Sequence, residues 1–232
     1  MNNLKKPLFV FVITLSLVTA SVYGQEFKYE IGGAAGISSY MGDANKSGFV
    51  LHQDIAAGLL FRYNINFHWA LKANLLGGSV KGNTEESGSS FPYGQQTAFR
   101  RSFTEAGAQL EFNFLPYSDK YGYTGTKPYT PYLFLGAGIT YAPGEIIYTG
   151  MNMPFGVGFK YKLKNRINIA IESSMRKLFS DDFDVTRKEH EWNLNQPYGI
   201  RSSLFKNRDW YSITMICLTW DFGVREDPCH GK

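Results

Sequence analysis

The chain has 232 residues, of which 44% are hydrophobic and 16% aromatic, and its formal net charge is +4. A nucleic-acid-binding protein would need a larger, clustered excess of Lys and Arg, so this balance excludes that class. A mean hydropathy of −0.24, with no apolar run of about 18 residues after the N-terminal segment, excludes transmembrane helices. The 24 Gly, 15 Tyr and 18 Phe favour strands.

The first 24 residues have the three parts of a secretory signal peptide. Lys5 and Lys6 precede a short apolar core, and the small residues Ala20 and Gly24 follow it; cleavage after either fits, and Gly24 is slightly favoured. The core has about eleven residues, fewer than the roughly 20 that a spanning helix needs. We therefore expect residues 1–24 to be removed, which leaves a net charge of +2 (+4 less two lysines); a retained amphipathic anchor is the alternative.

Beyond the signal, apolar and polar residues alternate in eight segments of about ten residues, the length that a tilted strand needs to cross a bilayer. One parity is apolar and uncharged, whereas the other holds glycines and all of the charge. The segments are 26–38, 53–63, 68–79, 102–114, 132–141, 154–163, 167–176 and 210–222. This pattern predicts an all-β fold, an eight-stranded antiparallel transmembrane β-barrel over residues 25–222 with a periplasmic tail at 223–232.

The charged parity predicts a network of ion pairs inside this barrel. An eight-stranded lumen is barely wide enough for its own side chains, and buried charges must be paired. The expected members are Lys28, Arg62, Lys72, Lys160, Lys162 and Arg176, with Glu30, Asp54, Glu105, Glu111, Glu172 and Asp221. We therefore expect a plugged lumen rather than a diffusion pore. A soluble secreted barrel, with the apolar parity inside, is the alternative.

Aromatic residues of the apolar parity concentrate at one end of the predicted barrel, as at a membrane interface, which favours the membrane barrel. An even strand number and a secreted N-terminus place both termini, and this end, in the periplasm of an outer-membrane protein. The last segment fits poorly, because its inward parity carries Tyr211, Ile213, Met215 and Cys217. The sequence does not decide whether Cys217 and Cys229 form a disulfide.

The connections are unequal in length. Extracellular loops are expected at 39–52, 80–101, 142–153 and 177–209, and short periplasmic turns at 64–67 and 164–166. The third periplasmic turn, 115–131, is long and contains four tyrosines and three prolines. Long ordered loops are usually functional, and Tyr is a favoured interface anchor. This turn predicts a partner-binding surface at Tyr117, Tyr121, Tyr123 and Tyr129; a solvated connector is the alternative.

No motif for catalysis or for a cofactor occurs in the chain. The four histidines lie on different segments, and there is no H-E-x-x-H, C-x-x-C or G-x-S-x-G pattern. The acidic cluster of Asp181, Asp182 and Asp184 is a calcium candidate, although a solvated acidic loop is the favoured interpretation. We therefore expect no enzymatic activity, no cofactor and no metal.

Several strings resemble a known family: YMGD at 40–43, NFLPY at 113–117, YTPYLFLGAG at 129–138, PFGVGFKYKL at 154–163 and DDFDV at 181–185. Together they resemble the PorG-like outer-membrane barrels of the Bacteroidota type IX secretion system. The resemblance implies a barrel without catalytic residues, monomeric within a larger complex and embedded in outer-membrane lipid. It also implies that the barrel holds a periplasmic ring of the lipoprotein PorK and of PorN at the outer membrane.

Two other functions stay open. A surface-binding or adhesion protein would use the long loops 80–101 and 177–209 outside the cell. Some eight-stranded barrels are lipid A-modifying enzymes with a lipid-facing Ser–His pair, but no outward His lies close to a Ser in this sequence.

Overall fold

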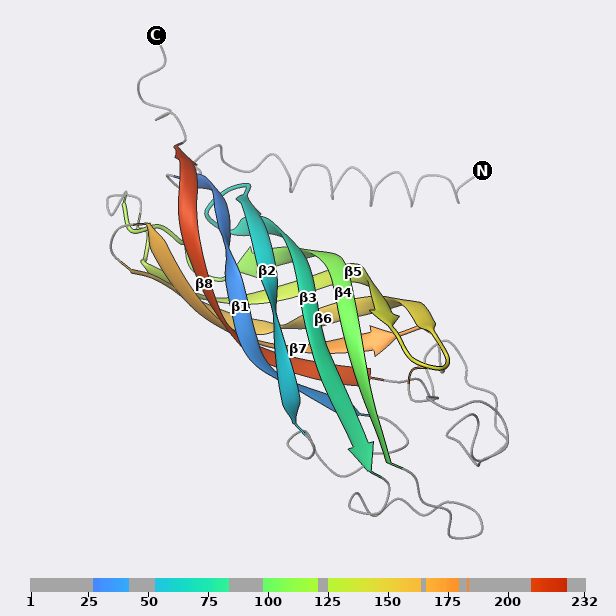
Figure 1. The fold of residues 1–232 in the computed structure, drawn as a ribbon. Coiled ribbons are helices and arrows are strands. Elements are labelled where there is room, and N and C mark those ends of the chain that lie inside the picture. Colours follow the sequence, from blue (N-terminus) through green and yellow to red (C-terminus); the bar gives the residue numbers. More distant parts are fainter. Residues whose placement is uncertain are drawn as a thin grey trace, which may run out of the picture.

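The computed structural model describes residues 27–41, 53–83, 98–120, 125–163, 166–179, 183 and 210–224. Within them, eight antiparallel strands form one closed ring, because β1 pairs with β8 as well as with β2 (Figure 1). The strands are β1 (Phe27–Met41), β2 (Asp54–Asn64), β3 (Trp69–Asn83), β4 (Ala98–Asn113), β5 (Tyr129–Ala142), β6 (Tyr148–Lys162), β7 (Ile167–Leu178) and β8 (Trp210–Val224). The predicted all-β, eight-stranded antiparallel barrel is confirmed.

The two ends of the barrel differ. β1 begins and β8 ends at the same end, which we call the terminal end; the opposite end is the loop end (Figure 1). The predicted signal peptide, 1–24, lies outside the described residues. Gly223 and Val224, which the prediction placed in the tail, belong to β8, and 225–232 lie outside the described residues.

The strands reach further toward the loop end than the alternation of apolar residues indicates. β6 begins at Tyr148, where it pairs with Ala142, so most of the loop predicted at 142–153 is strand. Likewise β4 begins at Ala98, which pairs with Asn83, so both ends of the predicted loop 80–101 are strand. The reason is that ladder hydrogen bonds join backbones and continue past the point where one side-chain parity stops being apolar.

The outer surface of the barrel is a continuous apolar belt. Its side chains are a third or more exposed, and they come from all eight strands: Ile31, Ile37, Ile55, Leu59, Leu71, Leu75, Leu110, Leu133, Leu135, Ile139, Val157, Ile169, Ile171, Ile216 and Leu218. A protein surrounded by water rarely exposes so large an apolar area, whereas a barrel in a bilayer requires it. The belt excludes the alternative of a soluble barrel. Among the described residues, no helix is long and apolar enough to cross a membrane.

Aromatic side chains ring the terminal end of this belt. Tyr29 contacts the rings of Tyr63 and Phe222, with centroids 5.6 and 5.4 Å away, and Trp69 lies 4.9 Å from Phe112. We call this set the aromatic girdle: Tyr29, Phe61, Tyr63, Trp69, Phe112, Phe114, Tyr129, Phe159, Tyr161, Trp220 and Phe222. Rings with a polar edge or tip favour the membrane interface, so the girdle marks one boundary of the hydrocarbon layer.

Glycines on the inward parity allow neighbouring strands to approach closely. A Cβ atom added at Gly36 would stand 2.0 Å from the carbonyl oxygen of Thr214 on β8, and one added at Gly58 would stand 2.2 Å from that of Leu75 on β3. No side chain fits at these positions unless the strands move apart. The small residues therefore keep the lumen narrow.

The belt predicts that an added charge destabilises the barrel according to its depth. Leu218 lies near the middle of β8 and is 57% exposed, and Val224, at the end of β8, is 62% exposed. We expect Leu218→Arg to lower the free energy of unfolding by about 2–4 kcal/mol and Val224→Arg by at most about 1 kcal/mol. Denaturant unfolding of the refolded barrel in phospholipid vesicles measures both. Equal, negligible effects would mean that this face lies in water.

Candidate functional site

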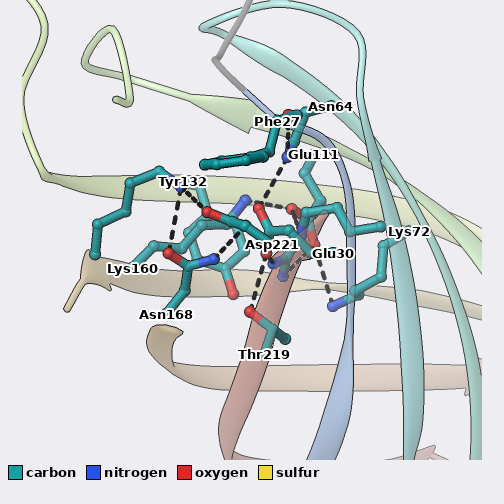
Figure 2. Close-up of polar contacts among 12 residues, drawn as sticks. Phe27, Glu30, Asn64, Lys72, Glu111, Tyr132, Lys160, Asn168, Thr219 and Asp221 are labelled. Carbon is teal, nitrogen blue, oxygen red and sulfur yellow. Dashed lines mark hydrogen bonds and ion pairs between the residues drawn. The ribbon is translucent and has the colours of Figure 1, made fainter. Parts of the chain in front are cut away.

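The lumen toward the terminal end holds a network of buried charges, which includes Glu30, Glu111 and Lys72 (Figure 2). Arg62 on β2 is its centre, because it lies within ion-pair distance of three carboxylates. The Arg62 guanidinium donates from Nε to Glu111 Oε2 at 2.8 Å and from Nη1 to Glu30. Asn64 and Thr219 donate further hydrogen bonds to Glu30, each at 3.0 Å. Arg62 and both carboxylates are almost completely buried, so the positive charge of Arg62 and the negative charges of Glu30 and Glu111 stabilise one another across the lumen.

Two lysines and a tyrosine complete the centre of the network. Lys72 Nζ lies 2.7 Å from Glu172 Oε2 and 3.3 Å from Glu111 Oε1. Lys160 donates to Glu111, and its Nζ stands 4.2 Å from the centre of the Tyr132 ring. The Tyr132 hydroxyl donates to Glu172 at 2.6 Å. Cations, anions and an aromatic face thus fill the same cross-section of the lumen.

Two further ion pairs extend this network. Lys162 Nζ lies 2.5 Å from Asp221 Oδ2, beside Asn168. Arg176 Nε lies 2.7 Å from Glu105 Oε2, which also accepts from the Tyr211 hydroxyl at 2.6 Å. The lumen network, by which we mean these buried residues, has five cations and five anions: Arg62, Lys72, Lys160, Lys162 and Arg176, with Glu30, Glu105, Glu111, Glu172 and Asp221.

The other two members of the predicted network lie elsewhere. Asp54 begins β2 at the loop-end rim, where its Oδ2 is 3.0 Å from Arg100 Nε and 3.8 Å from Lys81 Nζ. Lys28 is half-buried and forms no ion pair with another of the described residues. The structure therefore brings ten of the twelve predicted charges together.

Toward the loop end, apolar and aromatic side chains fill much of the lumen, beside the buried Arg101 and the Arg176–Glu105 pair. The packed cluster, which we call the loop-end seal, contains Tyr40, Leu76, Val80, Phe99, Phe103, Tyr148, Leu178, Phe183, Tyr211, Ile213 and Met215. Tyr211, Ile213, Met215 and Cys217 are all buried here or beside it, which accounts for the apolar inward parity of β8. The interior is therefore not uniformly polar, as the inward parity of the last segment indicated, because aromatic and aliphatic packing closes this half. Cys217 is a free thiol, and Cys229 lies outside the described residues.

Phe183, from the connection between β7 and β8, enters the loop-end seal. Its ring stacks on Tyr211 at 5.6 Å and meets the edge of Tyr148 at 5.2 Å, and it is completely buried. Arg101 Nη1 donates to the Phe183 carbonyl at 2.8 Å, and Nη2 of the same side chain reaches the Ala142 carbonyl at 3.3 Å. A buried cation thereby holds the backbone that carries this ring.

Tyr117, from the turn between β4 and β5, closes the terminal end in a comparable way. Its backbone N–H donates to the Phe67 carbonyl at 3.2 Å, and its ring centre is 5.0 Å from Lys162 Nζ and 5.9 Å from Lys160 Nζ. The side chain is completely buried, and its hydroxyl finds no hydrogen-bond partner among the described residues. Burial, reinforced by the nearby carboxylate of Glu30, raises the pKa of Tyr117 well above its usual value.

The predicted partner-binding tyrosines therefore do not share one surface. Tyr117 points into the lumen and is not available to a partner, which corrects its assignment. Tyr129 lies on the outer face of β5, 41% exposed and stacked on Phe159 at 6.2 Å, as a member of the aromatic girdle. Tyr121 and Tyr123 lie outside the described residues. The inward turn of Tyr117 was not predictable from the sequence, because no local pattern determines the direction of a loop side chain.

Sequence reasoning also missed several residues of the lumen. Tyr132 is on the charged parity of its predicted strand, so parity alone could have placed it beside Lys160. Arg101 fell in a predicted loop, and no sequence signal identifies Phe183 as buried. Among the described residues, no three His, Cys, Asp or Glu side chains gather as a metal site. The acidic cluster at Asp181, Asp182 and Asp184 lies outside them.

Removing Arg62 should show how strongly the stability of the barrel depends on equal numbers of buried cations and anions. We expect Arg62→Met to destabilise the barrel by about 3–5 kcal/mol, because Glu30 and Glu111 lose their shared partner inside the lumen. Adding Glu111→Gln restores equal numbers of charges, so the double variant should recover part of that loss. Denaturant unfolding in vesicles measures each variant. A double variant less stable than the single one would contradict the balance argument.

Comparisons with known proteins give one family and several solved barrels. Neisserial surface protein A (NspA) shares 11% identity over 84% of this chain and 97% of its own, with a TM-score of 0.47. Ail of Yersinia pestis shares 12% identity over 85% of this chain and 100% of its own, with a TM-score of 0.44. OprG of Pseudomonas aeruginosa shares 12% identity over 87% of this chain and 99% of its own, with a TM-score of 0.46. No curated protein sequence matches. Residues 6–232 match the model of the family described as Domain of unknown function (DUF6089), and the chain belongs to that family.

Proposed function

We propose that this barrel is the outer-membrane component of a type IX secretion system that anchors a periplasmic ring of PorK-like lipoprotein and PorN-like protein. The observation that carries this proposal is the filled lumen: an ion-pair network and aromatic residues from two connections occupy it toward both ends. A barrel closed in this way does not act by passing solutes. Its role is then that of a fixed body in the membrane that presents surfaces to partners, without catalysis.

The orientation follows from the connections. Both ends of the barrel sequence lie at the terminal end, together with the short connections that follow β2 and β6. In outer-membrane barrels the short turns and both termini are periplasmic. We therefore assign the terminal end, with its aromatic girdle, to the periplasmic side.

The connection between β4 and β5 is the surface we assign to the ring. It is held in place by the buried Tyr117 and by backbone hydrogen bonds, 2.8 Å from Lys127 to Pro116 and 2.9 Å from Ser118 to Lys127. The side chains of Asp119, Lys120 and Lys127 are exposed beside this anchor. The described parts of this connection, 114–120 and 125–128, already hold one conformation and so lose less conformational entropy on binding, which favours a lasting attachment.

The identity of the partner rests on the sequence resemblance. The strings NFLPY at 113–117 and YTPYLFLGAG at 129–138 flank this same connection and are among those that resemble PorG-like barrels. In this proposal, Tyr117 and Tyr129 act as structural anchors at the two ends of the connection. The residues that contact the ring lie between them and include Tyr121 and Tyr123.

Replacing the exposed part of the connection tests this assignment. We expect Tyr121→Ala, Tyr123→Ala and Lys127→Glu, combined in one variant, to leave the barrel folded but to abolish co-purification of the PorK-like and PorN-like proteins and to stop secretion. Heat-modifiable migration on a gel verifies the fold, and affinity purification from native membranes measures the partners.

Deleting residues 84–97 at the loop end is the matched control and should leave co-purification intact. If the turn variant still retains the ring and secretes normally, this surface is not the docking site. A phenotype that is lost only with the loop-end deletion would instead support a surface-binding or adhesion protein.

A further inference from the structure

A groove crosses the outside of the barrel wall, away from the lumen. It spans β3 to β7 and has a volume of about 690 Å³. Leu110, Leu133, Leu135 and Val157 line it with side chains that are 45–56% exposed, and Trp69 of the aromatic girdle lies at one end. Its lining is almost entirely apolar, and it belongs to the face that the apolar belt presents to lipid.

The groove follows one row of paired residues across the strands. The register joins Trp69 to Phe112, Phe112 to Leu133, Leu133 to Val157 and Val157 to Ser173. Strands in barrels tilt by about 35–45° from the axis, so a row at right angles to them climbs the wall obliquely. It rises from the girdle at the start of β3 toward the second half of β7, within the apolar belt.

The wall is recessed where β5 meets β6. The ladder between β5 and β6 runs from Tyr129↔Tyr161 to Leu135↔Phe155, is interrupted, and resumes at Gly138↔Asn152. Pro154 lies in the interrupted part of β6. Proline cannot donate a ladder hydrogen bond and is rarely found inside a central strand. Gly156 pairs with Phe134 and Ser174 on the inward parity, and all three also contribute to the groove lining. Gly156 therefore belongs to the groove, whereas Pro154 lies beside it.

The two serines that line the groove already have hydrogen-bond partners within the barrel: the Ser174 hydroxyl donates to the Ile213 carbonyl at 2.8 Å. The hydroxyls of Ser173 and Thr214 lie 3.2 Å apart and hydrogen-bond to each other. An occupant therefore needs no polar group along the groove. It must be apolar, elongated and present in the hydrocarbon layer.

We propose that this groove holds one acyl chain of a bilayer phospholipid, which enters at the Trp69 end. The groove is continuous with the lipid-facing belt, so bilayer chains already surround it, and no other molecule has to be brought to it. Trp69 lies in the girdle at the interface, where the lipid headgroup resides. The chain then follows the oblique row across β4, β5 and β6. This site is separate from the proposed ring-binding surface and does not depend on it.

Photo-crosslinking tests the proposal on the purified full-length barrel in vesicles of phosphatidylcholine and phosphatidylethanolamine. A trace phospholipid carries a diazirine within its acyl chain, and peptide mass spectrometry maps the labelled residues. We expect Leu133, Leu135 and Val157 to be labelled several-fold more than Leu59 and Ile216, which are at least as exposed on the same belt. Uniform labelling around the belt would overturn the proposal. Labelling of Leu133, Leu135 and Val157 no stronger than that of Leu59 and Ile216, as expected if the groove receives a partner protein instead, would overturn it as well.

A matched pair of substitutions separates the groove from general lipid contact. Leu135→Trp fills the recess and should reduce labelling at Val157 and Leu133 to the level of Ile216. Leu59→Trp adds the same side chain to the outer face of β2, outside the groove, and should leave the pattern unchanged. Heat-modifiable migration verifies that both variants fold. Undiminished labelling of Val157 in the Leu135→Trp barrel would contradict the proposal.

Discussion

Charge buried inside a narrow barrel must be paired within that barrel, and this constraint organises the rest of the structure. Arg62 lies between Glu30 and Glu111, and Lys72 and Lys160 approach Glu111 from other strands. The wall around them faces lipid, so water cannot compensate an unpaired charge from outside. Because the partners come from different strands, the pairing only forms when the ring is closed in one register.

The two ends of the lumen are closed by different physical means. Toward the terminal end, Tyr117 covers the lysines of the network and combines an aromatic face with their charge. Toward the loop end, Phe183 packs among other rings, and Arg101 holds its backbone carbonyl. Both plugs come from connections rather than strands. The barrel thus uses its connections to fill its interior, which leaves the outer rims and the lipid-facing wall as the surfaces on which partners can act.

The sequence predicted those features that depend on strict alternation. Period-two patterning located eight strands and separated Leu218, which faces lipid, from Glu172, which faces the lumen. It failed where backbone pairing or long-range packing decides. Tyr148 continues β6 through its ladder with Ala142, and Tyr117 turns inward because Lys160 and Lys162 lie on the inner side of β6. The groove on the outer wall likewise depends on which strands lie side by side, and a single sequence does not specify that.

The central claim is that paired charges and the two aromatic plugs keep the lumen closed. Single-channel recording of the purified full-length barrel in a planar bilayer tests it most directly. The account predicts a flat baseline at moderate voltage, because no continuous water path crosses the ion-pair network and the loop-end seal. Sustained openings on the nanosiemens scale would show a water-filled pore and would contradict it.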